Sequence, residues 1–332
     1  MPVPFILDTD TAQDDCIAII ASLLDPDADL RAITMVAGNV GFDQQVRNAH
    51  LTLNAVGRLG EVPIHLGCRR PLVLPLVSAE YVHGDGSGGL TMDFAGTGTE
   101  AEHAVDALTR LTAEAPGVIS VVAIGPLTNI AMAVVKDPSF VHNVNQLVIM
   151  GGSNNARGNI TAAAEFNFYV DPHAAKIVFE VGFDITVVPW APLTLSDAVF
   201  SRSQLAGIER IGTPLSEFFI QVCGPTLAFD EAVGIPGTTH PDSLAVAVLL
   251  HPELVRRASD YHVAIEAESS LTRGYAAMSW GVHGHSPNAR VIERADTAGF
   301  YQYLTNLLKT PTTPNRPFTA LTAPARSPNK RS

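Results

Sequence analysis

The chain has 332 residues, of which 46% are hydrophobic and only 16% are charged. This composition supports a large buried core and excludes a disordered chain or a small disulfide scaffold. The 21 basic and 33 acidic residues give a net charge of −12, which leaves no positive field to bind nucleic acid. The three widely spaced cysteines form no redox or zinc motif, and no export signal or membrane-spanning run is evident. We therefore expect a cytoplasmic protein without a membrane partner.

Short apolar runs alternate with helical patterns through the amino-terminal part of the chain. The runs predicted as buried strands are Phe5–Leu7, Ala32–Val36, Val118–Ile124, Leu147–Met150 and Ile185–Val188. The segments predicted as helices are Asp14–Leu24, Asp43–Leu59, Glu100–Ala113 and Asp171–Val181. In the last of these, Asp171 is expected to be the N-cap and Pro172 the first helical residue. This order predicts an α/β fold with a mostly parallel β-sheet flanked by helices, and a ligand site beyond the carboxyl ends of the strands.

The carboxyl-terminal part continues with more helical patterns. We expect helices at Ser201–Ile211, Leu215–Thr226, Asp242–Leu250 and Ala298–Leu308, and a strand-like alternation at Tyr261–Ala267. These elements are predicted to complete one domain over residues 1–308. From Lys309 onward, five prolines and five basic residues with little apolar periodicity predict a flexible tail over residues 309–332.

Four carboxylates lie within eight residues directly after the first predicted strand: Asp8, Asp10, Asp14 and Asp15. In a partly dry crevice they would repel and raise one another's pKa unless a cation compensated them. Helix capping and solvated turn acids explain one or two of the four. Oxygen-only ligands point to calcium or magnesium rather than a structural zinc. We therefore expect a hard metal ion here.

One alternative enzyme class also fits this opening. Asp8 and Asp10 resemble the start of haloacid-dehalogenase-like phosphatases, in which the first aspartate attacks phosphorus beside magnesium. Ala12 stands where those enzymes have threonine or valine. A metal-dependent phosphatase with Asp8 as nucleophile therefore remains a competing hypothesis.

Polar residues also follow the other predicted strands. Asn39 comes after the second strand, Thr128 and Asn129 after the third, and a polar stretch reaching Asn159 after the fourth. Amides, hydroxyls and carbonyls suit a hydroxyl-rich ligand or a calcium ion. Each pair alone is equally typical of a turn or a helix cap.

Two further polar positions lie inside apolar sequence. Glu165 and Asn167 are two residues apart, so they share one side if the segment is extended. Asp242 opens an apolar helical run, either as a plain cap or as a distant metal ligand.

Together these segments resemble one known family. The motifs are DTDTAQDD, Gly38-Asn39, His83-Gly84, GPLTN up to Asn129, Met150-Gly-Gly, Gly158-Asn159, the AEFN segment up to Asn167, Asp171-Pro172 and Asp242. Over roughly residues 3 to 308 the chain is similar to the inosine-uridine-preferring nucleoside hydrolases. The acidic opening and the AEFN segment are highly specific. The resemblance implies the Rossmann-like fold of that family.

The resemblance also implies an activity and a site. The reaction is hydrolysis of the N-glycosidic bond of ribonucleosides to ribose and a free nucleobase, a step of nucleoside salvage, in an enzyme that assembles as a homodimer or homotetramer. Calcium would be held by Asp10, Asp15, the backbone carbonyl of Thr128 and Asp242, with Asp10 as general base. The residues implied to grip the ribose are Asp14, Asn39, Asn159, Glu165, Asn167 and Asp242.

The chain departs from the family pattern in two places. Thr11-Ala12 replaces the usual Pro-Gly within the acidic motif, and Pro241 replaces the histidine that often precedes the last aspartate. The acid that protonates the leaving base is therefore open between His83 and His240.

Aromatic stacking on the base is the alternative to an acid. Trp190 and Trp280 are the candidates for it, and weaker candidates for the base pocket are Tyr169, Phe229, Asp230 and Glu231. A non-catalytic nucleoside or pentose-binding homologue is the third hypothesis, and the sequence does not rank the nucleobases.

Overall fold

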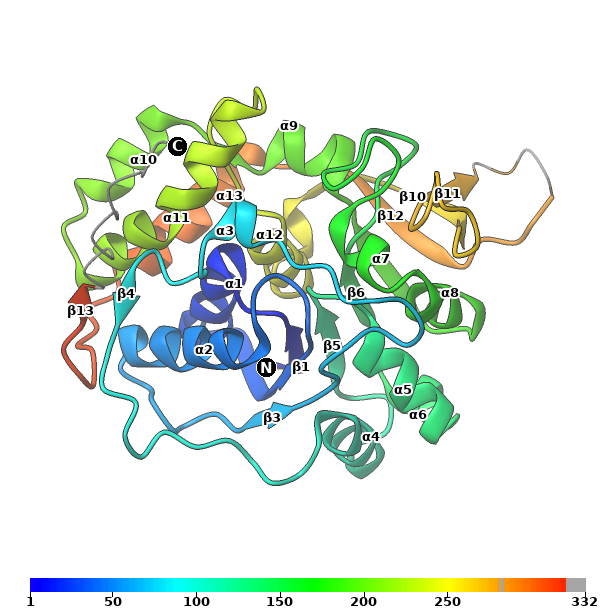
Figure 1. The fold of residues 1–332 in the computed structure, drawn as a ribbon, viewed down its shortest axis with the longest axis horizontal. Helices are drawn as coiled ribbons and strands as arrows, with labels where there is room; N and C mark the ends of the chain where they lie inside the picture. The colour runs from blue at the N-terminus through cyan, green and yellow to red at the C-terminus, as the bar shows by residue number, and fades with distance from the viewer. Residues whose placement is uncertain (280, 282–283, 321–332) are drawn as a thin grey trace, which may run out of the picture.

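The centre of the protein is a nine-stranded sheet in the order β11-β10-β12-β7-β6-β5-β1-β2-β3 (Figure 1). It is seen in a computed structural model that describes residues 1–279, 281 and 284–320. Neighbouring strands from β3 across to β12 are parallel, and β10 and β11 add antiparallel pairs at one edge. The strands of this sheet are β1 (Val3–Thr9), β2 (Ala28–Met35), β3 (Ile64–Leu66), β5 (Ser120–Ala123), β6 (Leu147–Met150), β7 (Ile185–Val188), β10 (Val255–Ile265), β11 (Ala276–Ser279) and β12 (Ala289–Ala295).

Two small ribbons and a set of helices complete the molecule. The ribbons pair β4 (Leu90–Thr91) with β13 (Thr319–Ala320) and β8 (Val199–Phe200) with β9 (Thr238–Thr239). The helices are α1 (Gln13–Leu24), α2 (Phe42–Val56), α3 (Glu80–His83), α4 (Ala104–Glu114), α5 (Thr128–Lys136), α6 (Phe140–Asn143), α7 (Phe166–Val170), α8 (Pro172–Glu180), α9 (Leu195–Asp197), α10 (Arg202–Glu209), α11 (Pro214–Ala232), α12 (Pro241–Leu250) and α13 (Thr297–Leu308), with a π-helical turn at Trp190–Thr194 and a 3₁₀ turn at Pro252–Leu254.

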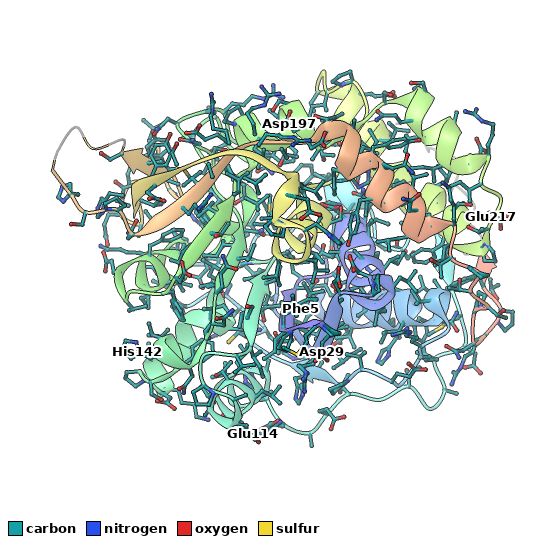
Figure 2. All side chains as sticks on the ribbon, turned by 180° about the vertical axis from the view of Figure 1, so that it is seen from behind. Phe5, Asp29, Glu114, His142, Asp197 and Glu217 are labelled. Atoms are coloured by element: carbon teal, nitrogen blue, oxygen red, sulfur yellow. The ribbon has the colours of Figure 1, made fainter. Side chains whose placement is uncertain are left out.

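Helices cover both faces of the sheet. Phe5 and Leu7 of β1 point into the layer formed by α1, α2, α11, α12 and α13, whereas Ile6 points into the layer of α4, α5, α6 and α8. Because both faces are buried at the centre of the sheet, the parallel strands β5, β6 and β7 are buried along their whole length and are mostly apolar rather than alternating. Figure 2 shows Phe5 in the interior and Glu114 and His142 at the periphery.

The α/β class and the mostly parallel sheet expected from the sequence are confirmed. The five predicted strand segments correspond to β1, β2, β5, β6 and β7, and Asp171 caps α8 by accepting a hydrogen bond from the backbone N–H of Ala174 (3.1 Å). Helix α5 and strand β3 were not predicted. The alternation at Tyr261–Ala267 lies within and just beyond β10, which is longer than expected because it pairs with both β12 and β11.

The predicted flexible tail differs from the structure as far as residue 320. The backbone of Arg316 exchanges two hydrogen bonds with the side chain of Asn54 on α2 (2.7 and 3.1 Å). Phe318 packs against Phe218 of α11, and β13 pairs with β4. These contacts fix residues 312–320 although their composition is typical of a linker. Residues 321–332 lie outside the described part of the chain.

Candidate active site

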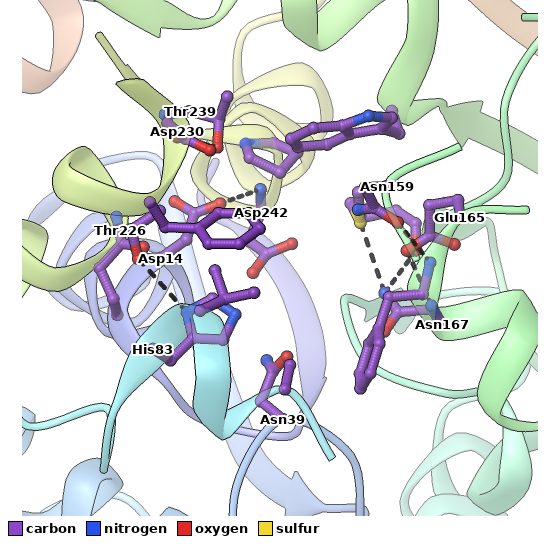
Figure 3. Close-up of a pocket in the computed structure, with 18 of the residues that line it drawn as sticks. Asp14, Asn39, His83, Asn159, Glu165, Asn167, Thr226, Asp230, Thr239 and Asp242 are labelled. Atoms are coloured by element: carbon purple, nitrogen blue, oxygen red, sulfur yellow. Dashed lines mark hydrogen bonds between the residues drawn. The ribbon is translucent and has the colours of Figure 1, made fainter. Parts of the chain in front are cut away.

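A cavity of about 200 Å³ opens at the carboxyl ends of β5 and β6. This edge holds the point where the chain order reverses, because β1 lies between β5 on one side and β2 on the other. Such a reversal is the usual ligand position in doubly wound sheets. The walls come from the segments after β5 and β6, from α3 and α11, and from the amino-terminal ends of α1 and α12 (Figure 3).

Asp10 is fully buried and, like Asp15, is not itself a lining residue; its contact with Asn39, which lines the cavity, places it beneath the cavity. Its Oδ2 accepts the backbone N–H of Asn39 (2.9 Å), and Oδ1 has no hydrogen-bond partner. Burial, followed by the charge of Asp15, raises the pKa of Asp10 well above its usual value. A Cβ atom at Gly38 would lie 2.0 Å from Oδ2 and one at Gly125 would lie 2.8 Å from Oδ1. Glycine at these two positions is therefore what allows the backbone to close around the carboxylate.

Asp15 is held beside Asp10 from the first turn of α1. Its Oδ1 accepts the hydroxyl of Thr9 (2.6 Å), and its Oδ2 accepts the backbone N–H of Ala12 (3.0 Å) and the side-chain amide of Asn39 (3.2 Å). Burial raises the pKa of Asp15 to about 6. Asn39, which lines the cavity, thus contacts both buried aspartates.

Asp14 and Asp242 join the two ends of the chain. The backbone N–H of Asp242, in the first turn of α12, donates to Asp14 Oδ2 (2.8 Å) across a separation of 228 residues. Both side chains line the cavity. Burial, followed by the charges of Asp14, Asp15 and Asp10, raises the pKa of Asp242 well above its usual value. Asp242, which is distant in sequence, therefore lies next to the amino-terminal aspartates. A shared site built from both ends of the chain depends on this arrangement.

These residues fit a hard divalent cation. Several carboxylates converge with only oxygen donors, and the buried Oδ1 of Asp10 lacks any partner. An acceptor in that state is costly unless a cation or a donor meets it. Thr128, whose backbone carbonyl the family resemblance implies as a ligand, is not among the lining residues; its hydroxyl donates to Asp171 Oδ2 (2.7 Å) at the start of α5. Ile124, which the sequence analysis did not name, is the β5-end residue that lines the cavity.

The opposite wall carries the AEFN segment. Glu165 is the N-cap of α7 and accepts the backbone N–H groups of Asn167 (2.8 Å), Phe168 (3.2 Å) and Gly152 (2.9 Å). The segment is therefore helical from Phe166 and not extended. Burial raises the pKa of Glu165 to about 7.

Two amides complete this wall. Asn167 donates to the backbone carbonyl of Ile124 (2.9 Å), and Asn159 accepts the backbone N–H of Phe166 (2.8 Å). Figure 3 shows Asn159, Glu165 and Asn167 together, facing Asp14 and Asp242 across the cavity.

The two histidines named from the sequence lie in different places. His83 lines the cavity from α3, with Nδ1 3.4 Å from the hydroxyl of Thr226. Burial lowers the pKa of His83 to about 4, so the imidazole is neutral at neutral pH. His240 does not line the cavity. It is fully buried between the rings of Phe200 and Phe219, with Nδ1 3.4 Å from Asp14 Oδ1.

The aromatic candidates separate in the same way. Trp190 lines the cavity, whereas Trp280 lies outside the described residues. Phe229 and Asp230 of α11 also line it, and Phe229 meets Tyr81 of α3 edge to face, with ring centroids 5.7 Å apart. Tyr169 and Glu231 are not lining residues, since each faces an arginine elsewhere. Tyr81 and Thr226 were not predicted as site residues, because their place at the cavity depends on how α3 and α11 pack and not on any local motif.

A second carboxylate group lies far from the cavity. Within the described residues, Asp25, Asp27 and His251 form the one group of three His, Cys, Asp or Glu side chains whose ligand atoms all lie within 4.8 Å of one another, and the aspartates beneath the cavity are more widely spaced. Asp25 is the C-cap of α1, whereas the cavity is at the start of that helix, so about 18 Å of helix separate them. Asp25 is already satisfied, because His251 and Tyr303 both contact its Oδ2 (2.7 and 2.8 Å). This group is therefore not part of the cavity.

Comparison with known proteins identifies the family. Residues 5–302 match the family model of inosine-uridine preferring nucleoside hydrolases. Over 315 residues the chain is 33% identical to the pyrimidine-specific ribonucleoside hydrolase RihA of Citrobacter koseri, which covers 93% of this chain and 98% of the relative.

Solved structures agree. A plant nucleoside hydrolase, PpNRh1, superposes with a TM-score of 0.85 at 28% identity and covers 94% of this chain and 100% of its own. The purine-preferring ribonucleoside hydrolase of Gardnerella vaginalis superposes with a TM-score of 0.84 at 27% identity, covering 92% and 99%. Among the described residues no helix has the length and hydropathy needed to cross a bilayer. The chain belongs to the inosine-uridine preferring nucleoside hydrolase family, and the enzyme class expected from its sequence, nucleoside hydrolase, is confirmed.

Proposed function

We propose that this protein hydrolyses the N-glycosidic bond of ribonucleosides at the cavity, with Asp10 as the general base and a calcium ion held beside it. The observation that carries this proposal is the contact between Asp242 and Asp14, which brings a distant carboxylate next to Asp10 and Asp15. A water that attacks C1′ of the ribose loses a proton to Asp10, whose Oδ1 is free to accept it. The products are ribose and the free base.

The proposed calcium ligands are Asp10, Asp15, Asp242 and one backbone carbonyl. The family resemblance implies Thr128 for that carbonyl, whereas the position of Ile124 at the cavity favours Ile124. Calcium accepts six to eight oxygen ligands and, when bound, makes a coordinated water more acidic. Magnesium, with stricter octahedral geometry, is the alternative that a metal titration distinguishes.

The two ends of the cavity suit the two parts of a nucleoside. Carboxylates and amides surround the inner part, where Asp14, Asn39, Asn159, Glu165, Asn167 and Asp242 are proposed to hold the ribose hydroxyls. These negative groups also stabilise the positive charge that develops on the ribose as the bond to the base breaks. Apolar and aromatic side chains of α3 and α11, with Trp190, form the outer part for the base.

A conservative substitution tests the general base. We expect Asp10→Asn to lower nucleoside hydrolysis by at least about a thousandfold while the fold is unchanged, because an amide cannot accept the proton. The measurement is release of reducing sugar from inosine, uridine, adenosine and cytidine, with calcium and with a chelator. Removal of the metal by the chelator should abolish the rate in the wild type.

Asp8→Asn is the matched control. Asp8 lies in β1, two residues before Asp10, and its Oδ1 is occupied by Thr34 (2.6 Å) and Asn129 (2.8 Å), neither of which lines the cavity. We expect this variant to retain the hydrolase rate. The phosphatase hypothesis predicts the reverse, with phosphate release from monoesters that is lost in Asp8→Asn. An unchanged rate in Asp10→Asn would discard the assigned mechanism, and binding without any turnover would favour the non-catalytic homologue.

Other expectations remain predictions. The relatives include a pyrimidine-specific enzyme and a purine-preferring enzyme, so the nucleobase preference of this chain is a matter for the same substrate panel. A homodimer or homotetramer and a cytoplasmic location stay predictions of the sequence analysis. Sedimentation measurements test the assembly.

A further inference from the structure

The described lining of the cavity carries more acidic than basic side chains. It includes four carboxylates, Asp14, Glu165, Asp230 and Asp242, and its only arginine, Arg157, is exposed at the rim. A cation held by the inner aspartates offsets charge at the ribose end. Such a cation does not offset the charge of Asp230, which lies on α11 in the outer part of the cavity, where the base is proposed to bind. This arrangement disfavours an anionic ligand and favours a positively charged one.

Asp230 is placed to meet a ligand directly. It is only 2% exposed, and its Oδ2 accepts both the backbone N–H (2.9 Å) and the hydroxyl (3.0 Å) of Thr239. No hydrogen bond from a described residue reaches Oδ1. Phe229, one residue earlier on α11, supplies an aromatic face in the same part of the cavity. An aromatic ring next to a buried carboxylate is a combination that binds flat cations.

The next acid along α11 provides a contrast. Glu231 is paired with Arg202 and does not line the cavity. Adjacent helical residues point about 100° apart, so α11 turns one carboxylate into the cavity and the other away from it. The acidity of the outer cavity therefore depends on one position.

The chemistry of the leaving base points the same way. A neutral base departs as an anion unless an acid protonates it. Of the two candidate acids, His83 is uncharged at neutral pH because burial lowers its pKa to about 4, and His240 does not line the cavity. A base that is already quaternised at the glycosidic nitrogen, or methylated at a second ring nitrogen, needs no such proton.

Building on the proposed hydrolase function, we propose that the preferred substrates include ribonucleosides with a cationic base, namely ribosylated pyridinium or N-methylated purinium rings, with Asp230 beside the cation. In the reaction the water oxygen forms a bond to C1′, and its proton passes to Asp10. The C1′–N bond breaks and its electron pair returns to the ring nitrogen, which neutralises the positive charge. The base leaves as a neutral molecule without an added proton.

The test compares cationic and neutral substrates in three proteins. The probes are nicotinamide riboside and 7-methylguanosine, compared with inosine and guanosine, in wild type, Asp230→Asn and Glu231→Gln at pH 8. At that pH Asp230 is ionised, since burial raises its pKa only to about 6. The amide of Asp230→Asn keeps an oxygen for Thr239. We expect Asp230→Asn to lower the ratio of kcat/KM for nicotinamide riboside over inosine by about tenfold or more.

Glu231→Gln is the charge-matched control, and we expect its ratio to stay within about twofold of wild type. Using a ratio between variants cancels the greater intrinsic reactivity of cationic nucleosides. An unchanged ratio in Asp230→Asn, or an equal fall in Glu231→Gln, overturns the proposal. Wild-type hydrolysis of inosine without hydrolysis of either cationic probe refutes this inference alone, whereas no hydrolysis of any nucleoside refutes the proposed function itself.

Discussion

The four carboxylates between Asp8 and Asp15 are each held by different partners. Asp8 is bound by side chains of β2 and α5, Asp10 by the backbone after β2, and Asp15 by Thr9 and Ala12 of its own segment. Asp14 accepts from α12. Four aspartates in one short segment therefore have different environments, because each one has different hydrogen-bond partners.

Asp8 carries a prediction about stability. It is fully buried, its Oδ2 has no partner, and burial raises its pKa to about 7. A carboxyl with a raised folded-state pKa binds a proton more tightly in the folded protein. Its contribution to stability is therefore fully present below about pH 4 and is lost as the pH rises through about 7. Asp8→Asn does not titrate, so we expect the variant to gain on the order of 2 kcal/mol relative to wild type between pH 5 and pH 8.

Denaturant unfolding at the two pH values, in the presence of a chelator, measures this gain. The control is Asp43→Asn, at a carboxylate whose side chain is 83% exposed. We expect its effect to differ by less than about 0.5 kcal/mol between the two pH values. If wild type and Asp8→Asn show the same pH dependence, the carboxyl of Asp8 is not protonated in the folded protein.

For single residues, the sequence predicts which side chains are candidates for the site better than it predicts where each side chain points. The acidic segment, Asn39, the AEFN segment and Asp242 were found because carboxylates and amides are rare in apolar surroundings. The cavity-facing Ile124 was missed, since a backbone carbonyl leaves no trace in the side-chain pattern. His240 was predicted as a possible acid because it is close to Asp242 in sequence. Closeness in sequence does not show that its ring packs between Phe200 and Phe219, away from the cavity.

Among the elements, α7 shows where periodicity fails. Five residues give too little pattern to distinguish a helix from a strand, and the apolar Phe166 and Phe168 are compatible with either. The outcome depends on Glu165, which caps the turn with two hydrogen bonds to backbone N–H groups. The alternation at Tyr261–Ala267 indicated part of β10, but strands β11 and β12 and their antiparallel pairing with β10 were not predicted, because pairing between distant segments is not visible in either one.

The carboxyl-terminal segment 312–320, here called the strap, has a structural role that its composition did not predict. Arg316 donates from its guanidinium to the backbone carbonyls of Asp93 and Ala95 (2.6 and 2.7 Å), directly after β4. The strap thereby fixes the segment that leads from α3, which carries Tyr81 and His83 of the cavity. It also contacts α11 through Phe318. The strap thus contacts α11 directly and also the chain that follows α3, and α11 and α3 are the two elements of the proposed base pocket.

Removing the strap should loosen the base pocket. We expect a chain that ends at Thr310 to show a KM for nucleosides raised about threefold or more, with a smaller change in kcat, because Asp10, Asp14 and Asp242 are left in place. The control ends at Ala320 and keeps every strap contact described here, so its constants should match those of the full chain. An equal loss of kcat and no change in KM in the shorter chain would contradict a role confined to the pocket.

For the whole molecule, the position of the site was predictable and its composition was not. A parallel sheet places the carboxyl ends of its strands at one edge, so polar residues after the strands had to gather there. The contribution of α11 and α12 depends on how the second half of the chain packs on α1, and this packing joins residues more than two hundred positions apart. The sequence named both Asp230 and Glu231 as base-pocket candidates, and only the structure shows that Asp230 lines the cavity whereas Glu231 does not.

Metal binding is also a property of the whole molecule, because the proposed ligands come from both ends of the chain. An ion that binds only the folded protein stabilises it by about 2.7 kcal/mol at one hundred times its dissociation constant. For a protein of this size we expect calcium to raise Tm by roughly 5 °C over the chelated protein. The increase should be largely lost in Asp242→Asn, which removes the ligand that joins the two ends.

Asp25→Asn decides between the two carboxylate groups. This variant disrupts the group of Asp25, Asp27 and His251 at the far end of α1 and leaves the cavity intact. It should lower Tm, since it weakens the contacts with His251 and Tyr303, yet the increase caused by calcium should be the same as in wild type. If calcium instead stabilises Asp242→Asn fully and Asp25→Asn not at all, the ion binds at the far group, and the carboxylates beneath the cavity act without it.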